Sequence, residues 1–166
     1  MPDSYGIPDQ LFGQVPGQFY AVVGRVTMLG ALLEQRLLEL LWAVDDGPPS
    51  LHAGKPVSQL MRFIEERLAS QPDDLCADAR EVLSSVSLVL EDRNAIVHSL
   101  WPEPTLKIAF SWRPRTLKRR ATAQEGMQGE FVTRQDLRAV ISKLVLVNEQ
   151  TTALAQRFHS RRATSS

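Results

Sequence analysis

The sequence predicts a mainly α-helical fold, an antiparallel bundle of about four helices with a short β-hairpin or extended insert between the third and fourth long helices. Two observations lead to this prediction. Apolar residues recur every three or four positions over four separate stretches, which is the periodicity of an amphipathic helix. One further stretch alternates between large apolar and other residues, which is the periodicity of a half-buried strand.

The first helix is expected over residues 19–44. Arg25 is the only charged residue between Phe19 and Leu33, so we expect this half to be buried on more than one side, at the centre of the bundle or in a dimer interface. The segment 45–49 contains two aspartates, a glycine and two prolines, which end the helix. The apolar stripe comprises Phe19, Val22, Val23, Val26, Leu29, Leu33, Leu37, Leu40, Leu41 and Val44.

Two further helices precede the insert. The second is short, over residues 56–69, and begins at a proline, which suits a first helical turn. The third runs over residues 73–100, and its first two residues are aspartates, which stabilise the positive end of a helix dipole. The segment 101–104 contains two prolines and ends the third helix.

The insert over residues 105–132 separates the third helix from the fourth. Large apolar residues alternate from Leu106 to Trp112, and Phe131 lies in a short return strand. The fourth helix follows, with Thr133 as its N-cap and Asp136 three positions later, an arrangement similar to a capping box. We therefore expect one helical domain over residues 1–166, with an extended N-terminal segment over 1–17 and a frayed polar tail over 160–166.

Composition and charge restrict the class of protein. Cys76 is the only cysteine, so no intrachain disulfide can form, and a reducing, cytoplasmic location is expected. No segment approaches the roughly 18 apolar residues of a membrane span, and the N-terminus does not resemble a signal peptide. Residues 1–105 carry 15 acidic and 7 basic side chains, whereas residues 106–166 carry 4 acidic and 12 basic. This asymmetry indicates an anionic partner, self-association through opposite charges, or an ordinary mixed surface.

Arg93 occupies an unexpected position on the third helix. With residues placed at about 100° intervals around the helix axis, Arg93 falls within the apolar stripe centred on Val86. Burial of an unpaired guanidinium would cost several kcal/mol, so Arg93 either meets a carboxylate or reaches a cleft that holds water or an anion. Glu34 and Asp92 are the candidate carboxylates.

Asn94 and His98 lie beside Arg93 on the same helix, and the three residue types suit phosphate chemistry. Asn94 and His98 are i and i+4, which makes their side chains neighbours. A guanidinium can clamp a phosphodiester, a histidine can move the proton of a ribose 2′-hydroxyl or of the leaving oxygen, and an amide can orient either. The structural alternative is that Arg93 pairs with a carboxylate and His98 caps carbonyls at the helix C-terminus.

The segment Glu91-Asp92-Arg93-Asn94-Ala95-Ile96-Val97-His98 resembles the signature of the HEPN superfamily, an arginine followed by a polar residue and then by a histidine. The resemblance extends over roughly residues 18–160 and implies a helical bundle. It also implies a metal-independent endoribonuclease, related to toxin or defence systems, in which Arg93, Asn94 and His98 act on RNA. Members often dimerise around a shared cleft, which implies a homodimer. Members also occur in toxin–antitoxin systems, which implies an antitoxin or other protein partner. The alternative is a HEPN-like module that binds a nucleotide or a protein without catalysis.

A basic run beside Trp112 provides a second candidate site for RNA. It could hold an RNA backbone while the indole stacks on a base, or it could be a solvated loop with Trp112 facing inward. The run comprises Arg113, Arg115, Lys118, Arg119 and Arg120. We predict no cofactor, no metal site and no membrane partner. His52 and His159 have no spaced partners, and Cys76 is expected to be a packed small residue.

Overall fold

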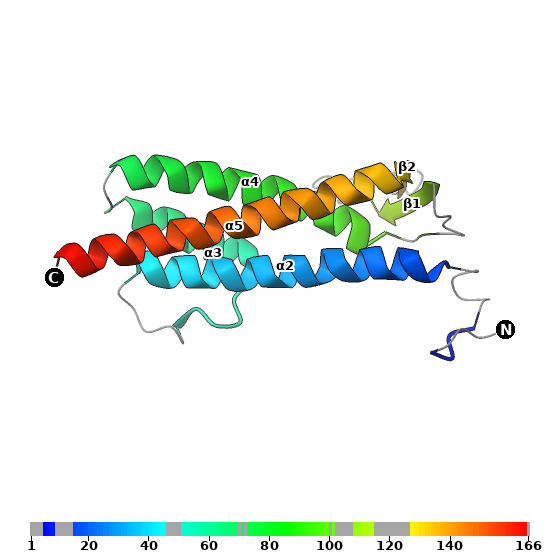
Figure 1. Ribbon diagram of the computed structural model, residues 1–166, viewed down its shortest axis with the longest axis horizontal. Coiled ribbons are helices and arrows are strands. Elements are labelled where there is room, and N and C mark those ends of the chain that lie inside the picture. The colour runs from blue at the N-terminus through cyan, green and yellow to red at the C-terminus, as the bar shows by residue number, and fades with distance from the viewer. Residues whose placement is uncertain are drawn as a thin grey trace. The chain divides into compact units, whose positions relative to one another are not determined.

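The computed structural model describes residues 5–8, 15–45, 51–69, 71, 73–99, 101, 108–114 and 127–165. These ranges contain four helices and two strands, which are labelled in Figure 1. Their order and bounds are α2 (Gly17–Val44), α3 (Val57–Leu68), α4 (Asp73–Val97), β1 (Ile108–Pro114), β2 (Met127–Thr133) and α5 (Arg134–Ser165). The predicted mainly helical fold class is confirmed, and the helix periodicities locate the helices to within a few residues.

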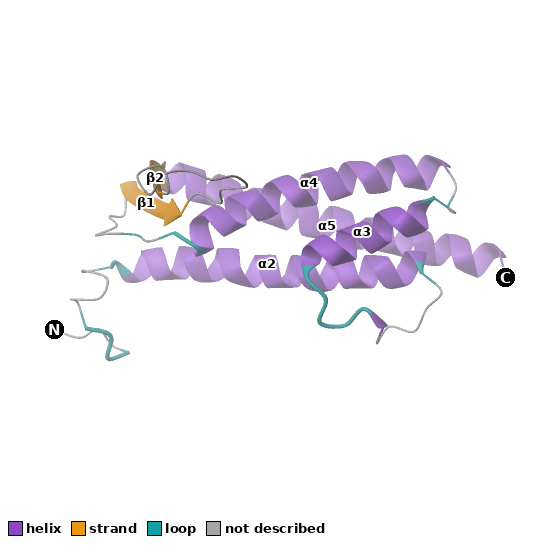
Figure 2. Ribbon diagram, turned by 180° about the vertical axis from the view of Figure 1, so that it is seen from behind, coloured by secondary structure: helices purple, strands orange, loops and turns teal. Residues whose placement is uncertain are grey.

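The insert between α4 and α5 is an antiparallel β-hairpin, as expected (Figure 2). Its ladder runs from the pair Ile108–Thr133 to the pair Pro114–Met127. Because β2 ends at Thr133 and α5 begins at Arg134, the hairpin continues directly into the last helix.

The chain divides into two compact units. The hairpin unit comprises Met1–Thr27 and Glu91–Ile141, and the bundle unit comprises Met28–Leu90 and Ser142–Ser166. The helices α2, α4 and α5 each contribute one segment to both units.

The bundle unit has an apolar core built from all four helices. Each fully buried leucine or valine contributes about 1.5–3 kcal/mol relative to an exposed one. Polar groups also join its helices, since the Asn148 amide on α5 donates to the carbonyl of Leu29 on α2 at 3.2 Å. The fully buried side chains include Leu33, Leu37, Leu40, Leu41, Ile64, Leu68, Leu83, Val86, Val89, Leu144 and Thr151.

Within one chain the apolar first half of α2 is not covered all round, so the expectation that it lies at the centre of the bundle is wrong, and the alternative of a dimer interface stays a prediction. Phe19, Val26 and Leu33 are buried. Met28 is 74% exposed and Tyr20 is 43% exposed, because they lie on the opposite face of the helix.

Aromatic packing fixes the end of α4 in the hairpin unit. The rings of Phe19 and Trp101 meet edge to face, with centroids 5.1 Å apart and planes at 67°. The indole Nε1 of Trp101 donates to the carbonyl of Ile96 at 3.0 Å, and Ile96 is itself buried. Trp101 therefore links the last turn of α4 to Phe19 near the start of α2.

The N-terminus of α5 has the predicted capping box. The backbone N–H of Thr133 donates to a carboxylate oxygen of Asp136 at 2.8 Å, and the backbone N–H of Asp136 donates to the Thr133 hydroxyl at 3.2 Å. These hydrogen bonds, led by the one from the Thr133 hydroxyl, hold the pKa of Asp136 below its ordinary value of 3.8.

The predicted frayed tail over 160–166 is corrected, because α5 continues to Ser165. The guanidinium of Arg161 donates to both carboxylate oxygens of Asp74 on α4, at 2.9 and 3.0 Å. This contact lies within the stretch that the polar composition alone marked as frayed, and it is visible only in the tertiary structure.

Candidate functional site

Arg93 lies on α4 in the hairpin unit and is half-buried, although the periodicity places it in the middle of the apolar stripe. Its Nη1 donates to the side-chain oxygen of the adjacent Asn94 at 2.9 Å. Its Nε is buried and meets no hydrogen-bond acceptor of the described residues. Within the described part of the hairpin unit, Arg93 makes no ion pair with a carboxylate such as Asp92. Glu34 is exposed and belongs to the bundle unit, so its pairing with Arg93 stays a prediction.

His98 is the first residue after α4 and is exposed. Its backbone N–H continues the helical pattern and donates to the carbonyl of Asn94 at 3.0 Å. The capping role considered for its side chain is filled by other residues, because the Ser99 hydroxyl donates to the carbonyl of Ala95 and the Trp101 indole donates to that of Ile96. The carbonyls of Ala95 and Ile96 therefore do not depend on the His98 imidazole.

The site is thus an exposed amide and an exposed imidazole one helical turn apart, next to a guanidinium that meets no carboxylate among the described residues. A guanidinium in this state retains N–H groups for an incoming anion, and phosphate suits its fork geometry. An exposed imidazole can exchange a proton with a bound substrate. Asn94 holds the guanidinium through its oxygen and keeps its amide N–H groups for a substrate or for His98.

The predicted basic run is described only in part. Arg113 is a residue of β1, where the backbone alone is described. The other members, Arg115, Lys118, Arg119 and Arg120, lie outside the described residues.

Two cations that sequence reasoning missed follow the hairpin. Arg134 and Arg138 are exposed on the first turns of α5 and are spaced i and i+4, so they are neighbours on one helix face. The capping box at Thr133 was the available signal, because it fixes where the helix begins and hence which residues share a face.

A buried polar cluster in the bundle unit was also missed. His52, for which no spaced partner was predicted, is 4% exposed, and its Nε2 lies 2.9 Å from a carboxylate oxygen of Asp45. The other oxygen of Asp45 accepts from Nε of Arg67 at 3.1 Å. The His52 ring also packs against Phe63, with centroids 5.1 Å apart. Because the ring is buried, the cluster is suited to fixing the chain after α2 rather than to reaction with a solvent-borne substrate.

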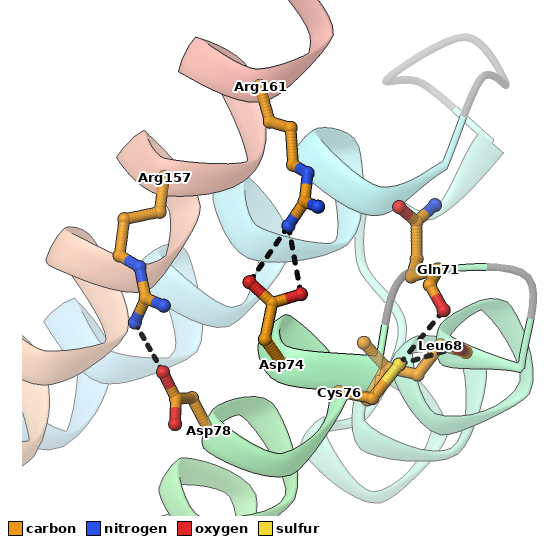
Figure 3. Close-up of polar contacts among 7 residues, drawn as sticks. All are labelled: Leu68, Gln71, Asp74, Cys76, Asp78, Arg157 and Arg161. Atoms are coloured by element: carbon orange, nitrogen blue, oxygen red, sulfur yellow. Dashed lines mark hydrogen bonds and ion pairs between the residues drawn. The ribbon is translucent and has the colours of Figure 1, made fainter.

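A groove between α4 and α5 in the bundle unit has a volume of about 240 Å³ and is crossed by an ion pair. Arg157 donates to Asp78 at 2.6 Å, and one turn further along α5 Arg161 meets Asp74 (Figure 3).

The thiol of Cys76 is buried and donates to the carbonyl of Leu68 at 3.0 Å, which confirms its packed position. These contacts tie helices together.

No three His, Cys, Asp or Glu side chains of the described residues gather as metal ligands would. Over the same residues, no helix is long and apolar enough to cross a membrane. In comparisons with known proteins, no family model, no curated protein and no solved structure matches the chain.

Proposed function

We propose that this chain is a metal-independent endoribonuclease of the HEPN type that its Arg-Asn-x-x-x-His segment resembles. One observation carries the proposal. Among the described residues of its unit the guanidinium of Arg93 meets Asn94 and no carboxylate, and the carbonyls of Ala95 and Ile96 beside His98 already accept from Ser99 and Trp101. Two side chains suited to phosphate chemistry thus stand together without a described structural role.

The reaction would be an internal transesterification of RNA. The ribose 2′-oxygen forms a bond to phosphorus as the bond from phosphorus to the 5′-oxygen breaks. His98 accepts the proton of the 2′-hydroxyl or donates one to the departing 5′-oxygen. The products are a 2′,3′-cyclic phosphate and a 5′-hydroxyl end, and no oxidant, reductant or water is consumed in this step.

Arg93 would bind the non-bridging phosphate oxygens and stabilise the charge that they gain in the transition state. Asn94 would position the guanidinium through the hydrogen bond it already accepts. A buried N–H without a partner costs about 1–3 kcal/mol, and an anion bound beside Arg93 could recover part of that cost.

The same resemblance supports a homodimer in which two such sites line one cleft. It also supports an antitoxin or another protein that restrains cleavage in the cell. If so, expression of the chain alone should inhibit growth of the host, and Arg93→Ala or His98→Ala should relieve that inhibition.

The direct test is cleavage of a pool of single-stranded RNA by purified protein in excess chelator. Wild type should cleave and leave cyclic phosphate ends, whereas Arg93→Ala and His98→Ala should lose about 100-fold or more of the rate. Arg80→Ala and His159→Ala are matched controls, since both residues are exposed in the bundle unit.

The controls should cleave at the wild-type rate. Cleavage that persists in both site variants would exclude the assignment. A folded wild-type protein that turns over no RNA, but binds a nucleotide or a protein, would support the non-catalytic alternative.

A further inference from the structure

The hairpin presents an aromatic residue to solvent. Phe131 on β2 is 69% exposed, whereas the next residue, Val132, is half-buried. Successive residues of a strand lie on opposite faces. The Phe131 side chain therefore lies on the solvent side of β2, opposite to that of Val132.

The strand register places further aromatic positions on that face. Phe110 is the direct partner of Phe131, and Trp112 is the partner of Gly129. Partners in an antiparallel ladder share a face, as do residues two apart. The positions of Phe110, Trp112 and Phe131 thus fall on one face, and a glycine lies across from the tryptophan position.

Positive charge follows directly after this face. Arg134 and Arg138 are exposed on α5, and neither makes a described ion pair. Asp136 lies between them, but its carboxylate accepts hydrogen bonds from the cap residue Thr133. The two guanidinium groups therefore remain available to an anionic partner.

We infer that the hairpin face is a stacking surface for single-stranded RNA, with bases on the aromatic face and phosphates at Arg134 and Arg138. This inference rests on the proposed function, since it names the form of RNA that the unit would take. Unpaired bases expose the flat faces that stack on aromatic rings, whereas base pairs in a duplex hide them. The adjacent cations favour a polyanion over a protein or a second copy of this chain.

Binding can be measured without cleavage. The probe is a fluorescent 2′-O-methyl oligouridylate of about twelve nucleotides, whose blocked 2′-oxygens cannot react, compared by anisotropy with a duplex of the same length. Wild type should bind the single strand more tightly than the duplex. Phe131→Leu keeps an apolar strand residue but removes the ring, and it should weaken binding about tenfold, whereas Phe131→Trp should restore it.

The double variant Arg134→Ala and Arg138→Ala should reduce the salt dependence of binding by about 1.4 in the slope of log K against log salt. Met28→Ala is the control, because Met28 is 74% exposed on α2 in the other unit and should leave binding unchanged.

Equal binding by wild type and Phe131→Leu would overturn the inference, as would preference for the duplex. A change of oligomeric state in Phe131→Leu without a change in RNA affinity would also overturn it and would identify the face as an interface between copies. If Arg93→Ala and His98→Ala leave cleavage unchanged while Phe131→Leu loses binding, the proposed active site fails but the stacking surface stands.

Discussion

Replacement of Arg93 by alanine separates a chemical role from a structural one through its effect on stability. An arginine held by a buried carboxylate would leave that carboxylate uncompensated when removed, at a cost of about 3–5 kcal/mol. Removal of an arginine that binds only the substrate should lower the free energy of unfolding far less. The two roles therefore predict different free energies of unfolding for one variant.

The contacts of Arg93 allow the cost to be worked out. The variant loses one exposed hydrogen bond to the adjacent Asn94, worth about 0.5 kcal/mol. It also loses the packing of a half-buried aliphatic stem, about 1 kcal/mol. Against this, it removes a buried Nε–H without a partner, which costs the wild type about 1–3 kcal/mol. Arg93→Ala should thus unfold within about 1 kcal/mol of wild type.

The measurement is urea denaturation followed by far-UV circular dichroism, with the slope m compared to confirm that the same surface unfolds. Arg67→Ala is the contrasting variant, because Arg67 does meet a buried carboxylate, that of Asp45, at 3.1 Å. Because Arg67 is itself 46% exposed and Asp45 keeps its contact with His52, this variant should lose less than a fully buried pair would, about 1.5–3 kcal/mol. A loss of 3 kcal/mol or more in Arg93→Ala would refute the reasoning, and a double-mutant cycle with Glu34→Ala would then test the ion pair as the cause.

Other features of the fold lead to three further predictions. Asp45→Ala should cost about 3 kcal/mol in urea denaturation, because it removes the acceptor of buried His52; Asp78→Ala, which breaks an exposed ion pair, should cost under about 1 kcal/mol, and equal losses would contradict the account. The Cys76 thiol should react with a disulfide reagent only as the fold opens, since Cys76 is 3% exposed. Rapid labelling of the native protein would contradict the buried position of Cys76. The pKa of Asp136 is lowered in the folded chain, so its contribution to stability is present above the unfolded pKa and is lost as pH falls through the folded pKa; acid unfolding below about pH 4 should therefore be shallower in Asp136→Asn, and unchanged steepness would argue against the cap.

Local sequence signals predicted most of the helices and strands, and they placed Arg93 on its helix. The spacing of apolar residues predicted the helices, and the change to alternation predicted the hairpin. The same periodicity placed Arg93 within the apolar stripe of α4, where the structure has it half-buried. The capping box formed by Thr133 and Asp136 was predicted because both of its hydrogen bonds join residues three apart.

Features that depend on distant residues could not be predicted in this way. His52 is buried because Asp45 and Arg67 converge on one another from positions 22 residues apart. The last turns of α5 stay helical alongside an ion pair between Arg161 and Asp74, 87 residues away. Periodicity reports which face of a helix is apolar, but it does not report which polar residues meet across the fold.

The central proposal is that the exposed imidazole of His98 transfers a proton in RNA cleavage and does not contribute to the stability of the fold. It is tested most directly on single preparations of His98→Ala and His159→Ala, each measured for its free energy of unfolding and for its rate of RNA cleavage in excess chelator. We expect both variants to unfold within about 0.5 kcal/mol of wild type, with cleavage lost only in His98→Ala. Loss of stability in His98→Ala, or equal cleavage by the two variants, would contradict the account.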